Sequence, residues 1–334
     1  MPKGEYLQYG GQAIIEGVMM RSPRFFSVAV RAPNNEIVLQ TEPLAKTWIG
    51  RQKWLKLPFL RGTLALLDAM GLGIRAMNFA ANVQMDEKYA EGKETENHEG
   101  ATAEGSKIVS HEKQGGSAIS NAAIGTAMFS GIAIGLLIFV FLPNVIGEQF
   151  RRVGVTNPTM LNLISGLFKV VVFLGYIWGI GKMKEIRRVF QYHGAEHKAI
   201  NTLEAEQALE LANCERQTRL HPRCGTSFAI IVLILDIFAL TFVPRYLMPD
   251  MPTYVNLLLR FGANILALPV IAGVAYELIR LAGKMRNNSL VMAMFAPGLM
   301  TQYLTTVEPD ESQIEVALVA LRAVVEAEES TPKG

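Results

Sequence analysis

The stretch Met160–Gly181 reads MLNLISGLFKVVVFLGYIWGIG and contains one charged residue, Lys169. A helix needs about 20 apolar residues to cross the roughly 30 Å hydrocarbon core of a bilayer. Three more apolar stretches of similar length lie near residues 119–142, 226–247 and 255–279. Because 50% of the residues are hydrophobic and 19% are charged, we expect a mainly α-helical, polytopic membrane protein with about four transmembrane helices.

The charges between these stretches predict the orientation of the protein. The connection 182–225 is rich in lysine and arginine, whereas the two opposite loops offer chiefly Arg151, Arg152 and Arg245. By the positive-inside rule this connection lies in the cytoplasm, and an even number of spans puts both termini on the same side. We therefore expect a multi-pass protein of the bacterial inner (plasma) membrane with both termini in the cytoplasm.

The remaining parts of the chain divide into a cap, a linker and a C-terminal region. Residues 10–45 alternate short β-like runs with turn residues, which predicts a small β-containing cytoplasmic cap. A helical pattern from residue 61 to about 83 is interrupted by Asp68 and Arg75, so we expect this helix to lie at the membrane interface. The predicted boundaries are 1–85 for the cap and interfacial helix, 86–117 for a flexible linker, 118–285 for the transmembrane domain, and 286–334 for interfacial and amphipathic helices.

The predicted C-terminal helix begins at Asp310 and carries an apolar stripe. The stripe consists of Ile314, Ala317, Leu318, Leu321, Val324 and Val325. Such a stripe needs a surface to cover it, so we expect a protein partner, or a second copy of the chain, to dock on this helix. Membrane lipids are the other expected partners. The net charge of +2 gives no electrostatic footprint for nucleic acid.

The histidines and cysteines are concentrated in one part of the chain. In QYHGAEHKAI, residues 191–200, His193 and His197 are one helical turn apart and can reach a single ion. The spacing H-x-x-E-H matches the inverted zinc hydrolases, in which the glutamate, here Glu196, is the catalytic base. His221 and Cys224 add an imidazole and a thiol, which suit zinc. We therefore predict zinc, or another divalent transition metal, bound by these three histidines and Cys224.

The sequence leaves several interpretations of this pattern open. Three protein ligands would leave a position for water and support a zinc-dependent hydrolase, whereas four would close the site. A closed site would make the protein a non-enzymatic scaffold or biogenesis partner with a structural zinc. A third interpretation, a transporter, is based only on the charged residues within the apolar stretches. Alternatively, the histidines are polar residues of a basic loop, and Cys214 is expected to be incidental.

Two further pairs of residues are candidates for a functional role. In GGQAIIEGVMMR, residues 10–21, Glu16 and Arg21 stand among apolar residues and glycines. They form either an ordinary turn and strand, or groups that hold a ligand in place or contact substrate. Lys169 and Asp236 lie at membrane depths that differ by about 3 Å. We predict that they form a buried ion pair, and the alternative is that each faces water or snorkels.

Four motifs taken together resemble the YqhQ-like bacterial membrane proteins, the family called domain of unknown function 1385. They are GGQAIIEGVMMR, FQYHGAEHK at 190–198, HPRCGTSF at 221–228, and APGLMTQYLTTVEPDESQIEVALVAL at 296–321. The resemblance covers nearly the whole chain outside the linker. It implies a metal-dependent enzyme whose site comprises Glu196 and the four candidate ligands, with no assigned reaction. The chain departs from pitrilysin-type inverted zinc hydrolases because it lacks a downstream glutamate ligand, whose place His221 or Cys224 would take.

Overall fold

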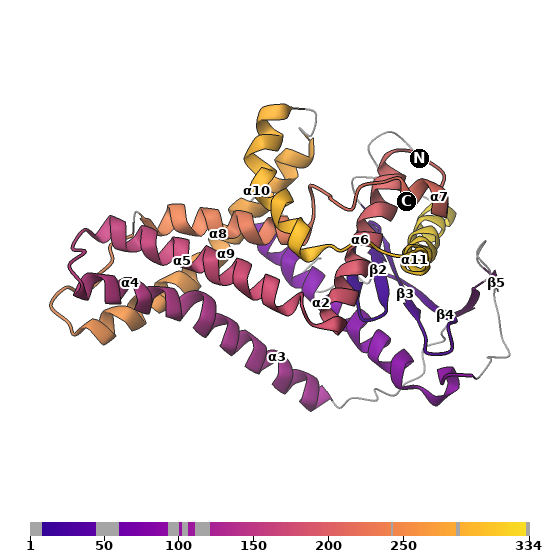
Figure 1. Cartoon of the computed structure of the whole chain (residues 1–334), viewed down its shortest axis with the longest axis horizontal. Coiled ribbons are helices and arrows are strands. Elements are labelled where there is room, and N and C mark those ends of the chain that lie inside the picture. Colours follow the sequence, from indigo (N-terminus) through magenta and orange to yellow (C-terminus); the bar gives the residue numbers. More distant parts are fainter. Residues whose placement is uncertain are drawn as a thin grey trace.

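The computed structural model describes residues 9–44, 60–92, 100–101, 106–110, 121–241, 243–284 and 288–331. Figure 1 shows an elongated bundle of helices joined to a β-sheet that is packed between helices. Helix α6 (Lys184–Glu204) and helix α10 (Ser289–Thr305) lie where these two parts meet. This junction positions the candidate site.

The N-terminal strands form an antiparallel meander in which β1 to β4 pair in sequence. The strand order is β1-β2-β3-β4-β6-β5, so β1 is an edge strand among the strands that the structure describes. Strands β5 and β6 lie within the segment expected to be a linker, and Val109 of β6 is buried. The strand bounds are β1 (Gly10–Ile14), β2 (Gly17–Arg21), β3 (Phe25–Arg31), β4 (Ile37–Pro43), β5 (Gly100–Ala101) and β6 (Lys107–Ser110).

Helices cover both faces of the sheet, because successive strand residues point to opposite sides. Val18 and Met20 of β2 face a core that they share with α6 and with α11 (Glu311–Ser330). Met19, between them, faces a second core that includes α2 (Leu60–Met85). Figure 1 shows α11 and α2 on opposite sides of the strands. The sheet is therefore the middle layer of this part of the molecule.

Helix α11 begins where the sequence predicts. The Asp310 carboxylate accepts the Gln313 backbone N–H at 3.0 Å, and the Gln313 side chain accepts the Asp310 N–H at 3.0 Å, which is a capping box. The apolar stripe is buried against the sheet and α6, where Ile314, Leu318 and Leu321 are at most 2% exposed. The surface that covers the predicted stripe is thus formed by the protein's own sheet and α6.

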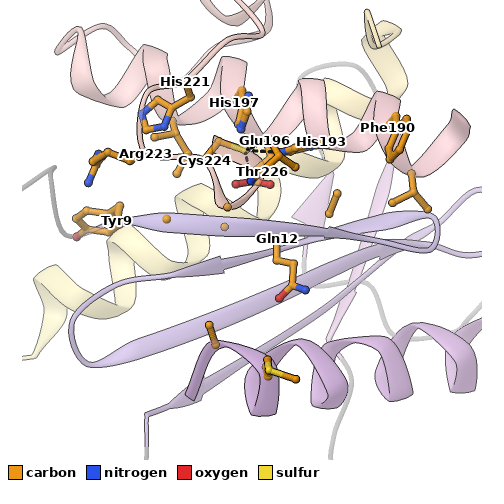
Figure 2. A pocket seen from close by; sticks show the side chains of 18 of the residues that line it. Tyr9, Gln12, Phe190, His193, Glu196, His197, His221, Arg223, Cys224 and Thr226 are labelled. Atoms are coloured by element: carbon orange, nitrogen blue, oxygen red, sulfur yellow. Dashed lines mark hydrogen bonds between the residues drawn. The ribbon is translucent and has the colours of Figure 1, made fainter. Parts of the chain in front are cut away.

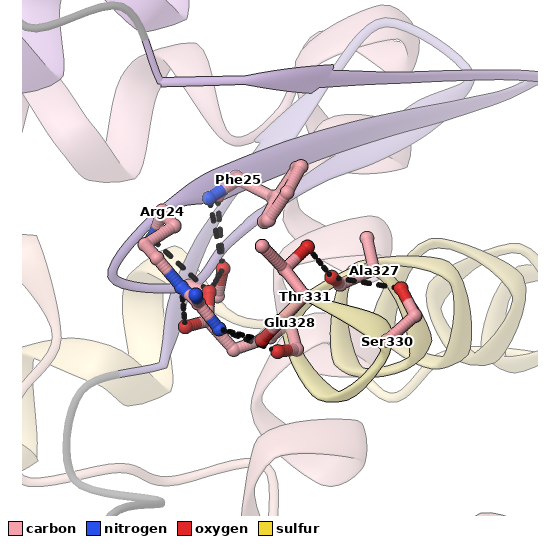
Figure 3. A network of polar contacts seen from close by, with 7 residues as sticks. Arg24, Phe25, Ala327, Glu328, Ser330 and Thr331 are labelled. Atoms are coloured by element: carbon pink, nitrogen blue, oxygen red, sulfur yellow. Dashed lines mark hydrogen bonds and ion pairs between the residues drawn. The ribbon is translucent and has the colours of Figure 1, made fainter. Parts of the chain in front are cut away.

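The C-terminal end of α11 is tied to the turn between β2 and β3 (Figure 3). The Arg24 guanidinium donates to the Glu328 carboxylate at 2.6 Å, and to the backbone oxygens of Glu328 and Thr331 at 2.6 and 3.0 Å. Carbonyls in the last turn of a helix have no partner within the helix, and a cation there is favoured by the helix dipole. Arg24 therefore both caps α11 and fixes its position on the sheet.

The apolar stretches predicted from the sequence form the helix bundle. The first is one nearly continuous helix, in which α3 passes through the π-helical segment η4 into α4. The next three form α5, α8 and α9, and α8 packs between its two neighbours. The bounds are α3 (Asn121–Leu136), η4 (Leu137–Phe141), α4 (Leu142–Arg152), α5 (Pro158–Ile180), α8 (Gly225–Thr241) and α9 (Thr253–Lys284).

In the described part of the chain, four helices are long and apolar enough to cross a membrane. By helix length and composition, this set of helices differs from the sequence expectation in two places. The third predicted stretch forms α8, whose 17 residues rise only about 25 Å. The helix expected at the interface, α2, meets the criterion of length and composition, because Asp68 and Arg75 still leave a sufficiently apolar window, but its second half packs against the sheet. The four segments are Gly62–Met85, Phe129–Arg152, Pro158–Ile180 and Thr253–Leu281.

Helix α2 connects the bundle with the sheet. Near its start, the Thr63 hydroxyl donates to the Pro269 carbonyl oxygen at 2.9 Å, about midway along α9. Further on, Leu72, Ala76 and Phe79 belong to the core beneath the sheet. The first half of α2 therefore runs beside the bundle, and the second half covers one face of the sheet.

Polar side chains are buried within the bundle. Lys169 of α5 and Asp236 of α8 form an ion pair whose side chains are 8% and 4% exposed. Further along the bundle, Arg260 donates to the Asn144 side-chain oxygen at 3.0 Å, and Arg245 donates to the Asn144 backbone oxygen at 3.2 Å. The sequence predicts an ion pair between Lys169 and Asp236 from their similar depth in the membrane, and the structure brings these two charges together.

Candidate metal centre

Helix α6 carries three of the candidate residues, His193, Glu196 and His197. The spacing of four residues places both imidazoles on one face, with ring centroids 4.4 Å apart. Gly194 lies against the segment that follows α10, where a Cβ would be 2.3 Å from the Val307 carbonyl oxygen. A glycine at this position therefore allows the histidine-bearing turn to approach that backbone closely.

The two α6 histidines are oriented by backbone carbonyls. His193 Nδ1 lies 2.8 Å from the Thr305 oxygen, and His197 Nδ1 lies 2.6 Å from the Arg219 oxygen. A carbonyl only accepts, so each Nδ1 donates, and in the neutral imidazole Nε2 then keeps its lone pair. Such carbonyl contacts fix the tautomer and the ring orientation of metal-binding histidines. The sequence predicts the pair of histidines, but not the carbonyls that orient them.

Cys224 lies immediately before helix α8 and faces the histidines. Its Sγ is 3.1 Å from His193 Nε2, and the candidate ligand atoms of His193, His197 and Cys224 all lie within 4.8 Å of one another. Burial raises the pKa of the Cys224 thiol, but hydrogen bonds to His197 and Thr226 outweigh it, and the pKa lies below its ordinary value. The N-terminal end of α8 also favours a thiolate.

Glu196 lies between the histidines and the edge strand β1. Its carboxylate accepts the backbone N–H groups of Gly11 and Ala13. A Cβ on Gly11 would come within 2.8 Å of the Glu196 Cγ, so a glycine is needed for this close packing. Burial raises the pKa of Glu196 to about 7, although the nearby His193 and the two N–H groups oppose the rise. Glu196 is thus a strongly perturbed carboxyl group beside the imidazoles.

His221 is placed differently from the sequence expectation. Its Nε2 lies 3.2 Å from the Glu204 carboxylate, which also pairs with Arg223. Burial alone would raise the pKa of Glu204, but His221 and Arg223 lower it to about 2. The His221 ring centroid is 5.7 Å from that of His197. The structure therefore brings three of the four predicted ligands together and directs His221 toward Glu204.

A residue that sequence reasoning missed holds the Cys224 segment in place. Gln302 of α10 is completely buried, accepts the His221 backbone N–H at 2.8 Å, and donates to the His221 carbonyl oxygen at 2.7 Å. The same amide group donates to the Ser227 hydroxyl at 2.7 Å. The sequence signal that could have revealed Gln302 is a glutamine within a mainly apolar helix. Such a residue indicates a buried polar group whose hydrogen bonds are satisfied.

The structure does not bring Glu16 and Arg21 into the site. Glu16 occupies the turn after β1 with a φ of 52°, and its carboxylate contacts Arg188 and the Tyr192 hydroxyl on the outer part of α6. Arg21 ends β2, opposite Phe26 of β3. Neither residue lines the pocket described below. Glu16 fastens α6 to the first hairpin instead.

A pocket of about 470 Å³ opens beside the cluster. Figure 2 shows Glu196, His193, His197 and Cys224 above β1, with Gln12 pointing to the other side of that strand. Two nitrogens and one sulfur converge here, and this donor set fits zinc with one coordination position left over. The lining includes residues 10–13 of β1, Leu66, Ala69 and Met70 of α2, Val189 and Phe190 of α6, and the residues of the cluster.

Comparisons with known proteins place the chain among relatives without an assigned activity. The family model described as protein of unknown function (DUF1385) matches residues 57–327. The chain is 32% identical over 324 residues to the uncharacterized protein YqhQ of Bacillus subtilis (strain 168), covering 96% of this chain and 93% of that protein. No solved structure matches. The family predicted from the sequence motifs is therefore confirmed.

Proposed function

The chain belongs to the DUF1385 family of proteins of unknown function, and we propose that it is a membrane-anchored, zinc-dependent hydrolase. In this proposal His193, His197 and Cys224 hold the zinc ion, and Glu196 is the catalytic base. The sheet, α6 and α11 lie on the cytoplasmic side of the inner membrane, and α2 runs from the bundle to the sheet.

One observation carries the proposal: three ligand groups of zinc-binding type converge at the side of a pocket that also contains a buried carboxylate. Structural zinc sites have four protein ligands, whereas catalytic sites have three and leave a position for water or substrate. The contact of His221 with Glu204 disfavours the closed site that a purely structural role requires.

Each residue of the cluster has a separate part in hydrolysis. A bound zinc ion would supply Lewis-acid polarisation of a carbonyl and a lowered pKa for water. The Thr305 and Arg219 carbonyls keep the two imidazoles in the ligating orientation. The Glu196 carboxylate takes a proton from the attacking water and returns it to the leaving atom.

The charge distribution supports the proposed membrane orientation. In the bundle, the described segments Phe129–Arg152, Pro158–Ile180 and Thr253–Leu281 are long and apolar enough to cross the membrane. Lys182, Lys184, Arg187 and Arg188 lie where α5 ends and α6 begins, at the junction with the sheet (Figure 1). Basic residues near membrane spans favour the cytoplasmic side.

The proposal is tested by metal content together with activity. We expect about one zinc per chain in gently purified protein, and near-complete loss in the His193→Ala, His197→Ala double variant. Glu196→Gln should keep the metal and lose hydrolysis, because the amide cannot accept the proton. His221→Ala is the matched control and should keep its metal. Undiminished hydrolysis by Glu196→Gln would rule out Glu196 as the base. Full metal occupancy in the double variant would rule out His193 and His197 as ligands.

A further inference from the structure

We infer that the pocket beside the cluster takes an acyl ester or amide of a membrane amphiphile, with the acyl chain lying along the first half of α2. This inference rests on the proposed hydrolase function and names its substrate class. It combines three observations. The pocket has an apolar wall, the outward N–H groups of β1 already have hydrogen-bond partners, and the arginine at the pocket is already paired with a carboxylate.

The apolar wall of the pocket is formed by the part of α2 that runs beside the helix bundle. Leu66 and Met70 of α2 line the pocket and are 38% and 44% exposed. One turn before Leu66, Thr63 contacts Pro269 midway along α9, which is one of the helices able to cross a membrane. Leu66 and Met70 lie on the α2 side of β1, so a chain lying on them reaches the cluster around the edge of this strand, past residues 10–13 that also line the pocket.

The edge of β1 argues against an extended peptide as substrate. A peptide that adds to an edge strand needs free outward N–H and C=O groups on that strand. In β1, the N–H groups of Gly11 and Ala13 already donate to the Glu196 carboxylate. The part of the strand nearest the cluster therefore has its outward donors engaged, and it cannot offer them to a substrate backbone.

The charges at the pocket favour a neutral reacting group over a phosphodiester. Phosphate groups are bound by arginine or lysine side chains that can turn toward them. Arg223 lines the pocket, but it pairs with Glu204. In the inferred reaction, the water oxygen bonds to the acyl carbon as the ester or amide bond breaks. One proton passes through Glu196 to the leaving oxygen or nitrogen, giving a carboxylic acid and an alcohol or amine.

Binding is tested with the full chain in phosphatidylcholine nanodiscs and a palmityl glycerol ether that carries a diazirine in its chain. This probe cannot be hydrolysed, so it reports binding alone. We expect light-induced cross-links to α2 and to the Val189–Phe190 part of α6. The Leu66→Asn, Met70→Asn variant should show about tenfold fewer, since covering the exposed parts of these two half-buried side chains accounts for roughly that factor. Leu67→Asn is the matched control, because Leu67 is 52% exposed and does not line the pocket.

Hydrolysis is then compared for para-nitrophenyl palmitate and para-nitrophenyl acetate. We expect the palmitate-to-acetate rate ratio to fall about tenfold in the Leu66→Asn, Met70→Asn variant and to stay unchanged in Leu67→Asn. Metal-dependent hydrolysis without a preference for the long chain would overturn the substrate class and leave the hydrolase standing. Cross-linking in the pocket with neither ester hydrolysed would support the binding site and count against the hydrolase. Cross-links that Leu66→Asn, Met70→Asn does not reduce would overturn the binding site.

Discussion

The polar side chains buried in the helix bundle and those gathered on α6 differ in how their donors and acceptors are matched. In the bundle, the Lys169 cation meets the Asp236 anion, and Arg260 meets an amide oxygen of Asn144. On α6, the orienting carbonyls leave the Nε2 lone pairs of His193 and His197 facing the sulfur of Cys224. The Lys169–Asp236 pair is complementary within itself, whereas the α6 cluster directs several acceptors at one point.

This difference separates a structural role from a ligand-binding role. A complementary pair is satisfied by its own members, and its value lies in joining α5 to α8. Acceptors that converge on one point are satisfied by a proton or, better, by a metal cation. Such an arrangement is therefore typical of a metal site. Burial and polarity alone would not distinguish the two groups, since both are largely inaccessible to solvent.

The largest effect is expected for the bundle pair. Lys169→Met or Asp236→Leu alone should lower the free energy of unfolding by about 3–5 kcal/mol, because each leaves an uncompensated buried charge. The double variant should lose less than either single variant. Thermal unfolding in detergent measures this coupling, and metal content should stay unchanged in all three. Strictly additive losses would show that the two charges do not act as a pair.

An intermediate effect is expected for Gln302. This residue of α10 holds the segment that places Cys224 beside the α6 histidines. Gln302→Ala leaves the His221 backbone groups and Ser227 without their partner, which costs about 1–3 kcal/mol of stability. Groups that orient metal ligands typically contribute about 10–100-fold to metal affinity, so zinc should bind correspondingly more weakly. Competition with a chromogenic chelator measures this loss.

The control for Gln302 lies on the same helix. Met300 is 67% exposed, so Met300→Ala should leave both stability and zinc affinity at wild-type values. An equal loss of zinc affinity in Met300→Ala would mean that α10 acts through general destabilisation, and that Gln302 does not position the Cys224 segment.

The smallest effect is expected for Arg24, which belongs to neither group. Arg24→Ala removes the cap of α11 and should cost about 1 kcal/mol, because the Arg24 side chain is 32% exposed and its charge is partly screened. Zinc content should not change. Denaturant titration measures the stability, and a loss of metal in this variant would contradict the separation between the α11 clamp and the site.

The features predicted from the sequence are those with a local or periodic cause. Apolar runs give the bundle helices, and a spacing of four gives the His193–His197 pair, since both follow from helix geometry. The meeting of Lys169 with Asp236 followed from counting residues along two spans. The capping box at Asp310 likewise needs only four consecutive residues.

The features that were not predicted depend on contacts distant in sequence. His221 has the right chemistry for a ligand, but Gln302, 81 positions away, and Glu204 decide where it points. The α11 stripe correctly signals burial, yet the pattern does not specify that the chain's own sheet covers it. The role of α2 depends on Thr63 meeting α9, which no local pattern contains.

The most direct test of the three-ligand site is the absorption spectrum of the cobalt-substituted protein. Tetrahedral cobalt with a thiolate ligand gives intense visible bands and a sulfur-to-cobalt charge-transfer band. We expect this spectrum at about one cobalt per chain, loss of the charge-transfer band in Cys224→Ser, and a shift of the visible bands when acetohydroxamate occupies the remaining position. Four-coordinate bands that acetohydroxamate leaves unchanged, or that disappear in His221→Ala, would contradict an open site formed by His193, His197 and Cys224.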